Sequence, residues 1–200
     1  MMQFIDLAKQ QKIIRDKIDL RIAKVLNHGQ FIMGPEVYEL EKQLSQYVGI
    51  DYCITCSSGT DALLIPLLAH NISVGDAVIT SPFTYIATAE VIRMLGATPI
   101  FIDIDPKTYN INPEKIPLAI EEAKKKSLNP KAIIPVDLFG LPADHIKIEK
   151  YAREYDLFYI DDAAQGFGGE IKGKKVCSFG DVSATSFFPA KPLGCYGDGG

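Results

Sequence analysis

Short apolar runs of strand length alternate with amphipathic segments of helix length through most of this 200-residue chain. Apolar runs predict strands within residues 76–82, 98–105, 131–140 and 157–165, and helical spacing of apolar residues predicts helices within residues 35–49, 84–96 and 145–156. Near-continuous apolar strands separated by helices indicate a three-layer α/β fold with a mostly parallel sheet covered on both faces. In such sheets ligands bind beyond the carboxyl ends of the strands, so these ends are where a site is expected.

Composition excludes several classes of protein. With 47% hydrophobic and 23% charged residues, the chain can form one sizeable core. A formal net charge of -4 without clustered basic residues argues against a nucleic-acid partner. The one basic run, residues 124–126, follows Glu121 and Glu122 and reads as the solvated face of a helix.

The distribution of charge also argues against a membrane protein. The first 22 residues carry a charge every few positions, and no apolar run reaches the roughly 20 residues that a membrane span needs. We therefore expect neither a signal peptide nor a membrane partner. A cytoplasmic location is predicted.

Cys53 and Cys56 form a C-x-x-C pair that could hold a metal or exchange thiols. Cys177 and Cys195 do not form a second close pair, and the three histidines match no ligand spacing. The alternative, a strand that ends in a buried, reduced cysteine pair, is favoured. No metal is predicted.

The segment Ser58-Gly59-Thr60 follows this predicted strand and leads into a helix. Free N–H groups and the dipole at a helix N-terminus favour an anion such as phosphate, and a glycine allows close approach. The alternative is an ordinary N-cap by Ser58. Asp61 would mildly repel a phosphate, and Pro66 is predicted to kink the helix.

Two other strand ends carry candidate residues. Asp161 and Asp162 end the strand within 157–165, and alternation sends their side chains to opposite faces. One of them could meet a cationic ligand, or it could form a helix cap or an ion pair. Tyr85, after the strand within 76–82, could offer its ring to a flat ligand or belong to the core.

Lys191 lies in the segment TSFFPAKPLGCYGDGG, residues 185–200, between prolines and glycines. Together with the strand-end residues it supplies what pyridoxal phosphate (PLP) needs: a phosphate site, an aromatic plate, an acid for the pyridinium nitrogen and a Schiff-base amine.

The segments SSGTDAL, FTYIATAE, IDIDPKTYNI, IIPVDLFG, IDDAAQGFGG and TSFFPAKPLGCYGDGG resemble, in this order, those of the DegT-type nucleotide-sugar aminotransferases, which are PLP enzymes of fold type I. The resemblance implies that Lys191 forms the Schiff base and that Asp162 keeps the pyridinium nitrogen protonated. It further implies contacts of Gln165 with the ring oxygen and of Tyr85 with the ring. The implied phosphate ligands are Gly59, Thr60 and Ser186.

The same resemblance implies a substrate and an assembly. Glutamate would donate the amino group to a ketone on a nucleotide-linked sugar, in surface-polysaccharide synthesis, and the enzymes most similar act on UDP-linked 2-acetamido-3-oxo-glucuronate. A homodimer is expected for a full-length chain, with sites completed by the partner subunit. Residues 1–200 would be a truncated large PLP domain that lacks the small C-terminal domain, so the chain alone is expected to fold poorly and to lack turnover.

Three alternatives stay open on the sequence. A Rossmann dehydrogenase would alternate strands and helices too, but the first strand-to-helix turn lacks G-x-G-x-x-G. A sugar dehydratase of the same family would typically replace Lys191 with histidine. The chain could also be a non-catalytic or inactive fragment that merely binds PLP or another chain.

Overall fold

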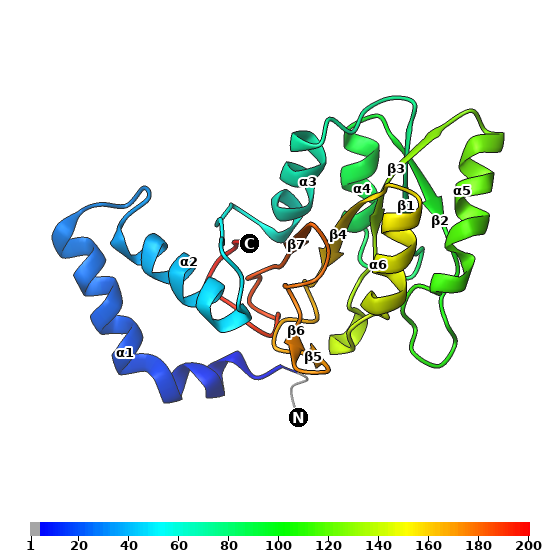
Figure 1. Ribbon diagram of the computed structural model, residues 1–200. Helices are drawn as coiled ribbons and strands as arrows, with labels where there is room; N and C mark the ends of the chain where they lie inside the picture. Colours follow the sequence, from blue (N-terminus) through cyan, green and yellow to red (C-terminus); the bar gives the residue numbers. More distant parts are fainter. Residues whose placement is uncertain (1–4) are drawn as a thin grey trace. The chain divides into compact units, whose positions relative to one another are not determined.

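The computed structural model describes residues 5–200 and divides the chain into two units, Met1–Thr55 and Cys56–Gly200. The first unit holds two helices, α1 (Leu7–His28) and α2 (Pro35–Val48) (Figure 1). Gly29 and Gly49 end them with φ of 68° and 85°, a conformation that glycine adopts without steric cost. Helix α2 confirms the helical spacing of residues 35–49, whereas α1 was not predicted.

Ion pairs join the two helices of the first unit. Arg21 lies 2.9 Å from Glu39, and Lys24 lies 3.0 Å from Glu36. Because most of these side chains are well exposed, the pairs contribute little to stability.

The second unit contains a five-stranded sheet in the order β2-β1-β3-β4-β7, in which every pairing is parallel. The strands are β1 (Asp76–Thr80), β2 (Thr98–Phe101), β3 (Asn129–Ile134), β4 (Phe158–Asp162) and β7 (Val182–Ala184). Three of the four predicted apolar runs contain a strand, β1, β2 or β4, and the run 131–140 overlaps β3, which begins two residues earlier. The parallel sheet that the alternation indicated is therefore confirmed.

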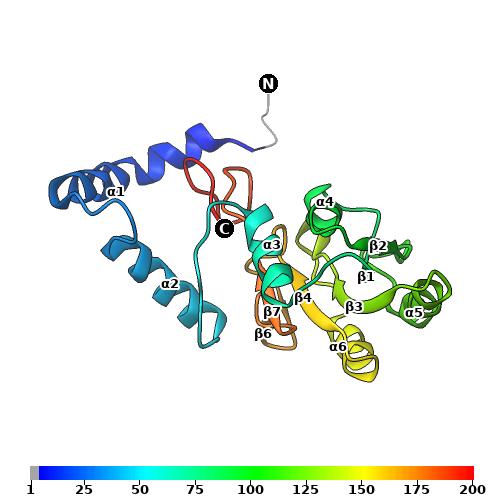
Figure 2. The ribbon, with the colours of Figure 1, turned by 90° about the horizontal axis from the view of Figure 1, so that it is seen from above.

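Helices cover both faces of this sheet (Figure 2). Helices α3 (Gly59–Ala69) and α4 (Ala87–Met94) lie on one face, and α5 (Ile116–Lys125) and α6 (His145–Glu154) lie on the other. Two buried apolar clusters result, one around Val78, Ile134 and Ile160 and one around Ile79, Ile133 and Tyr159. Neighbouring residues of a strand belong to different clusters because side chains alternate across a sheet, which explains why these strands are apolar throughout.

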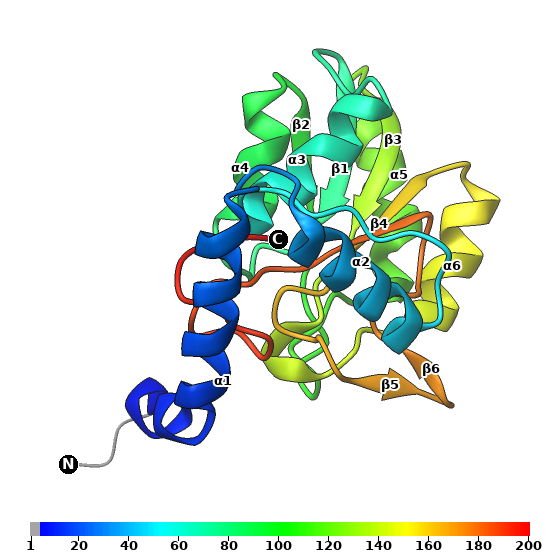
Figure 3. The ribbon, with the colours of Figure 1, turned by 90° about the vertical axis from the view of Figure 1, so that its left-hand side faces the viewer.

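Smaller elements connect the strands. The 3-10 helices are η1 (Pro113–Lys115) and η2 (Leu138–Gly140). The strands β5 (Glu170–Ile171) and β6 (Lys174–Lys175) form a separate antiparallel pair after β4 (Figure 3). Among residues 5–200, no helix is both long enough and apolar enough for a membrane crossing.

Two predictions for the segment before Ser58 were wrong. Residues 52–56 form no strand, although Cys56 exchanges backbone hydrogen bonds of 2.9 and 3.2 Å with Gly200. Cys53 and Cys56 are half-buried rather than buried. Helix α3 continues through Pro66 to Ala69.

Candidate active site

Most of the predicted site residues lie at or just after the carboxyl ends of strands of the second unit. Tyr85 lies in the loop after β1, Gln165 in the turn after β4, and Ser186 and Lys191 in the segment after β7. Gly59 and Thr60 begin α3. All of them therefore belong to one unit.

Gly59 and Ser186 form a tight contact at the N-terminus of α3. A Cβ atom on Gly59 would lie 2.5 Å from Cβ and 2.9 Å from Oγ of Ser186, so only glycine fits. Ser58 also caps the helix, because its Oγ accepts a hydrogen bond of 3.0 Å from the N–H of Asp61. The N-cap and an anion site are compatible, since the cap satisfies one N–H group and the first turn of a helix has several.

The side chain of Asp162 is buried on the face of β4 that packs against α4. It is 4% exposed, its Oδ2 accepts a hydrogen bond of 2.8 Å from the Thr88 hydroxyl, and its Oδ1 accepts one of 3.3 Å from the N–H of Ala164. Burial raises the pKa of Asp162, while Thr88, the N–H of Ala164 and the positive charge of Lys191 pull it down. A carboxyl group in this position is stabilised as an anion by a cationic neighbour.

Asp161 faces the other side of β4. Its Oδ2 accepts hydrogen bonds of 3.3 Å from the N–H of Cys177 and from the hydroxyl of Ser183. Full burial, and then the nearby charge of Asp137, raise its pKa well above the ordinary value. The two adjacent acids thus have separate surroundings, as the alternation of the strand predicted.

Backbone hydrogen bonds within the Lys191 segment itself hold its loop in shape. The N–H groups of Phe187 and Cys195 donate to Gly199 and Phe187 over 2.7 and 2.8 Å, and the N–H of Lys191 donates to Phe188 over 2.8 Å. The lysine is half-buried, and its charge acts on Asp162. The loop therefore presents one cation to the buried acid at the end of β4.

The side chains of Gln165 and Tyr85 differ in their surroundings: one is hydrogen-bonded and the other is exposed. Oε1 of Gln165 accepts a hydrogen bond of 2.9 Å from the N–H of Phe139, which fixes the side chain across the strand ends. Tyr85 is 67% exposed, so its ring does not belong to the core. The alternative of a core aromatic is therefore wrong for Tyr85.

The sequence reasoning missed three residues around Asp162. Thr88 bonds its carboxylate directly, and Thr84 lies 3.1 Å from the Thr88 hydroxyl. Asp137 donates its N–H to the backbone carbonyl of Asp162 over 3.0 Å. The i, i+4 pair of threonines at the start of a helix was a usable signal, but nothing in the sequence indicated which strand end it would face.

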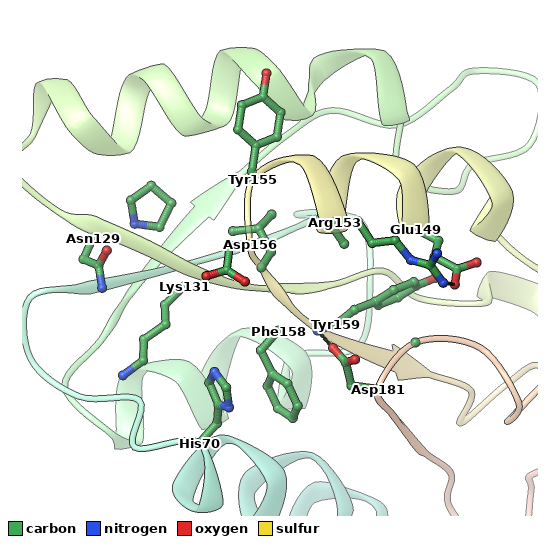
Figure 4. A pocket seen from close by; sticks show the side chains of 14 residues that line it. His70, Asn129, Lys131, Glu149, Arg153, Tyr155, Asp156, Phe158, Tyr159 and Asp181 are labelled. Carbon is green, nitrogen blue, oxygen red and sulfur yellow. Dashed lines mark hydrogen bonds and ion pairs between the residues drawn. The ribbon is translucent and has the colours of Figure 1, made fainter.

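A pocket of about 860 Å³ lies at the opposite edge of the sheet, around the amino ends of β3 and β4 (Figure 4). His70 stacks on Phe158 with ring centroids 4.1 Å apart, and Arg153 pairs with Glu149. The pocket contains none of the predicted site residues. Because ligands of α/β sheets bind at the carboxyl ends, it is not the candidate active site.

Comparison with known proteins identifies the family. Residues 12–200 match the DegT/DnrJ/EryC1/StrS aminotransferase family. The chain belongs to this family. Its members are PLP-dependent enzymes, so the resemblance of the sequence segments is confirmed at the level of the family and its cofactor.

Two curated relatives of this aminotransferase family are similar over nearly the whole chain. The UDP-2-acetamido-2-deoxy-3-oxo-D-glucuronate aminotransferase of Pseudomonas aeruginosa is 53% identical over 200 residues, which are 100% of this chain and 54% of the relative. The UDP-N-acetyl-3-dehydro-alpha-D-glucosamine 3-aminotransferase of Acidithiobacillus ferrooxidans is 43% identical over 196 residues, 98% and 52% of the two chains. The chain spans about half the length of the curated relatives it matches.

Solved structures of the family share the fold. A DegT DnrJ EryC1 StrS aminotransferase from Brucella abortus matches with a TM-score of 0.98 and 50% identity, over 100% of this chain and 54% of that one. NtdA from Bacillus subtilis, solved with the cofactor PMP, matches with a TM-score of 0.88 and 35% identity, over 99% and 43% of the two chains. The fold is therefore that of the PLP-dependent aminotransferases.

The residues at the carboxyl edge fit this cofactor. Gly59 packs on Ser186 at the N-terminus of α3, a place where the first N–H groups of a helix and its dipole favour a phosphate. The buried acid with a nearby lysine suits a pyridinium ring that needs both an anion and an amine.

Proposed function

We propose that residues 1–200 form the PLP-binding part of an enzyme that transfers an amino group to a ketone on a nucleotide-linked sugar. The observation that carries the proposal is the convergence of Asp162 and Lys191 at the carboxyl edge where Gly59 and Ser186 form their contact. The relatives named for sugar-nucleotide amination support the substrate class.

Each residue has a defined task in this proposal. The N–H groups of Gly59 and Thr60 and the hydroxyl of Ser186 bind the phosphate. The carboxylate of Asp162 keeps a proton on the ring nitrogen, Gln165 binds the ring oxygen, and Tyr85 packs on the ring. When bound, PLP supplies an electron sink that stabilises negative charge on the carbon that loses its proton. Nζ of Lys191 holds the cofactor and then carries that proton.

The finer parts of the proposal concern the whole protein. Glutamate is proposed as the amino donor and a UDP-linked 2-acetamido-3-oxo-glucuronate as the acceptor, for surface-polysaccharide synthesis in the cytoplasm. A homodimer with sites shared between subunits is proposed for the full-length enzyme. The alternative is that this chain binds PLP without turnover, which an assay with glutamate and the keto-sugar nucleotide decides.

Borohydride reduction of the PLP-loaded protein followed by peptide mapping tests the proposal. The pyridoxyl group is expected on Lys191, and Lys191→Ala should abolish the labelling because Lys191 is the lysine whose charge acts on Asp162. The lysines of the β5–β6 segment, Lys172, Lys174 and Lys175, are internal controls. A label on one of them, or an unlabelled protein, contradicts the proposal.

A further inference from the structure

A buried polar cluster lies behind the candidate site, on the face of β4 opposite to Asp162. It consists of Asp137, His145, Tyr159 and Asp161, and we call it the imidazole cluster. Nε2 of His145 lies 2.9 Å from Oδ1 of Asp137, and Nδ1 is hydrogen-bonded to the Tyr159 hydroxyl. Asp137, His145 and Asp161 are each 0% exposed, so the groups of this cluster interact without water.

Hydrogen bonding in the cluster is incomplete on the carboxyl side. Oδ2 of Asp137 and Oδ1 of Asp161 are buried oxygens that have no hydrogen-bond partner among the described residues. Oδ1 of Asp161 lies 3.9 Å from Nε2 of His145. The imidazole thus lies close to both carboxyls, and its Nε2–H donates to Asp137 because a carboxylate can only accept.

Three of these residues also offer atoms that could bind a metal ion, all within 4.8 Å of one another. The imidazole nitrogen nearest to both acids, however, already forms its hydrogen bond of 2.9 Å with Asp137. A shared proton accounts for this contact, whereas a metal would need to replace it. The ring of His145 is also held by stacking on Phe179, with centroids 4.2 Å apart.

Asp137 connects the cluster to the turn that carries the site residues. Its N–H donates to the carbonyl of Asp162 over 3.0 Å, and its Oδ1 also accepts the N–H of Ala143 over 2.7 Å. A Cβ on Gly166 would lie 2.5 Å from Cβ of Asp137, so the turn packs directly on this side chain. Gln165 directly precedes Gly166, and the orientation of Asp137 therefore determines where residues 162–166 lie.

We infer that His145 is a positioning residue: by holding Asp137 from behind the sheet, it fixes the turn 162–166 so that Asp162 and Gln165 face the cofactor site. The inference rests on the proposed function for the identity of the ligand, but the ordering of the turn is a property of the cofactor-free protein. If the imidazole is removed, the buried carboxylate of Asp137 loses the charge-assisted hydrogen bond that Nε2–H of His145 donates to it.

The test compares His145→Phe, which keeps a ring against Phe179 but lacks the donor, with His145→Gln, whose amide can replace Nε2–H. Amide hydrogen exchange is measured by mass spectrometry on the cofactor-free protein, in peptides that cover Ala163 and Gly166, whose N–H groups bond Ala184 and Ala163 over 2.8 and 3.0 Å. Exchange in His145→Phe is expected to rise about tenfold in these peptides, and His145→Gln should restore most of the protection. The dissociation constant for PLP should also rise about tenfold in His145→Phe.

Asp76→Asn is the matched control for general destabilisation. Asp76 is also buried and bonds Asn129 and Lys131 over 3.1 and 3.3 Å, but it lies at the amino edge of the sheet. The variant Asp76→Asn should lower global stability without a selective increase in amide hydrogen exchange at residues 162–166. Equal exchange in Asp76→Asn and His145→Phe, or a metal ion retained by the wild type and lost in His145→Phe, overturns the inference. If wild-type PLP binding fails, the proposed function falls, while the exchange comparison still decides the inference.

Discussion

Replacement of Thr88 by valine isolates the hydrogen bond that holds Asp162. Valine has the shape of threonine but no hydroxyl, so the 2.8 Å bond to Oδ2 is lost and only the 3.3 Å bond from the N–H of Ala164 remains. A hydrogen bond to a charged group contributes about 1.5–3 kcal/mol. Because this bond favours the charged carboxylate, its loss should raise the pKa of Asp162.

The expected consequence is weaker binding of a cationic ring. PLP affinity at neutral pH should fall about tenfold or more, and the loss should shrink as the pH is raised because the carboxylate then regains its charge. The assay is PLP titration by absorbance from pH 6 to 9, with Thr88→Ser as the control that keeps the hydroxyl. If Thr88→Val binds PLP like the wild type at every pH, the hydrogen bond does not tune Asp162 and the reasoning is refuted.

Two further predictions concern packing and charge. Gly59→Ala should lower the free energy of unfolding, measured by chemical denaturation, by about 1–3 kcal/mol and should weaken PLP binding, because the new Cβ would lie 2.5 Å from Ser186. Gly197→Ala is the control, since a Cβ there would have nothing within 4 Å. Equal effects of both substitutions would contradict the packing argument. The raised pKa of buried Asp161 means that the folded state binds its proton more tightly than the unfolded state, so this group's contribution to stability is present at low pH and is lost as the pH rises through the folded pKa. Asp161→Asn should therefore gain stability relative to the wild type between acid and neutral pH in urea unfolding, and a constant difference across that range would argue against the assignment.

The sequence predicted the layers of the sheet unit well, because burial on both faces leaves a strong pattern. Strand β3, for example, is fully apolar over Ala132, Ile133 and Ile134, and its residues belong alternately to the two clusters. Helix α1 was missed for the opposite reason: its described residues include none that is buried, so it lacks the apolar stripe on which the prediction of helices depends. The strand expected before Ser58 failed because pairing is set by distant residues, here Gly200, and not by local composition.

The candidate site was predictable only where a residue type is rare for its place. A glycine at the start of a helix, adjacent acids at a strand end and a lysine between prolines each departed from what packing alone requires. Asp137 and His145 gave no such signal, since an acid before a turn is ordinary, and the pair Thr84 and Thr88 did not indicate which strand end it would face. Their contribution depends on which side chains the topology brings together over 74, 25 or 8 positions of sequence, as in the bonds Thr88–Asp162, Asp137–Asp162 and His145–Asp137.

The contact between Gly59 and Ser186 joins the two ends of the sheet unit, since α3 comes first in this unit and Ser186 follows its last strand. Contacts between such distant segments have a high loop-closure cost and form late in folding. The proposed phosphate ligand at this contact would therefore bind a chain in which β7 is already in place. Such binding would stabilise that state by mass action, so the half-life of the protein in a cell should depend on the supply of its ligand.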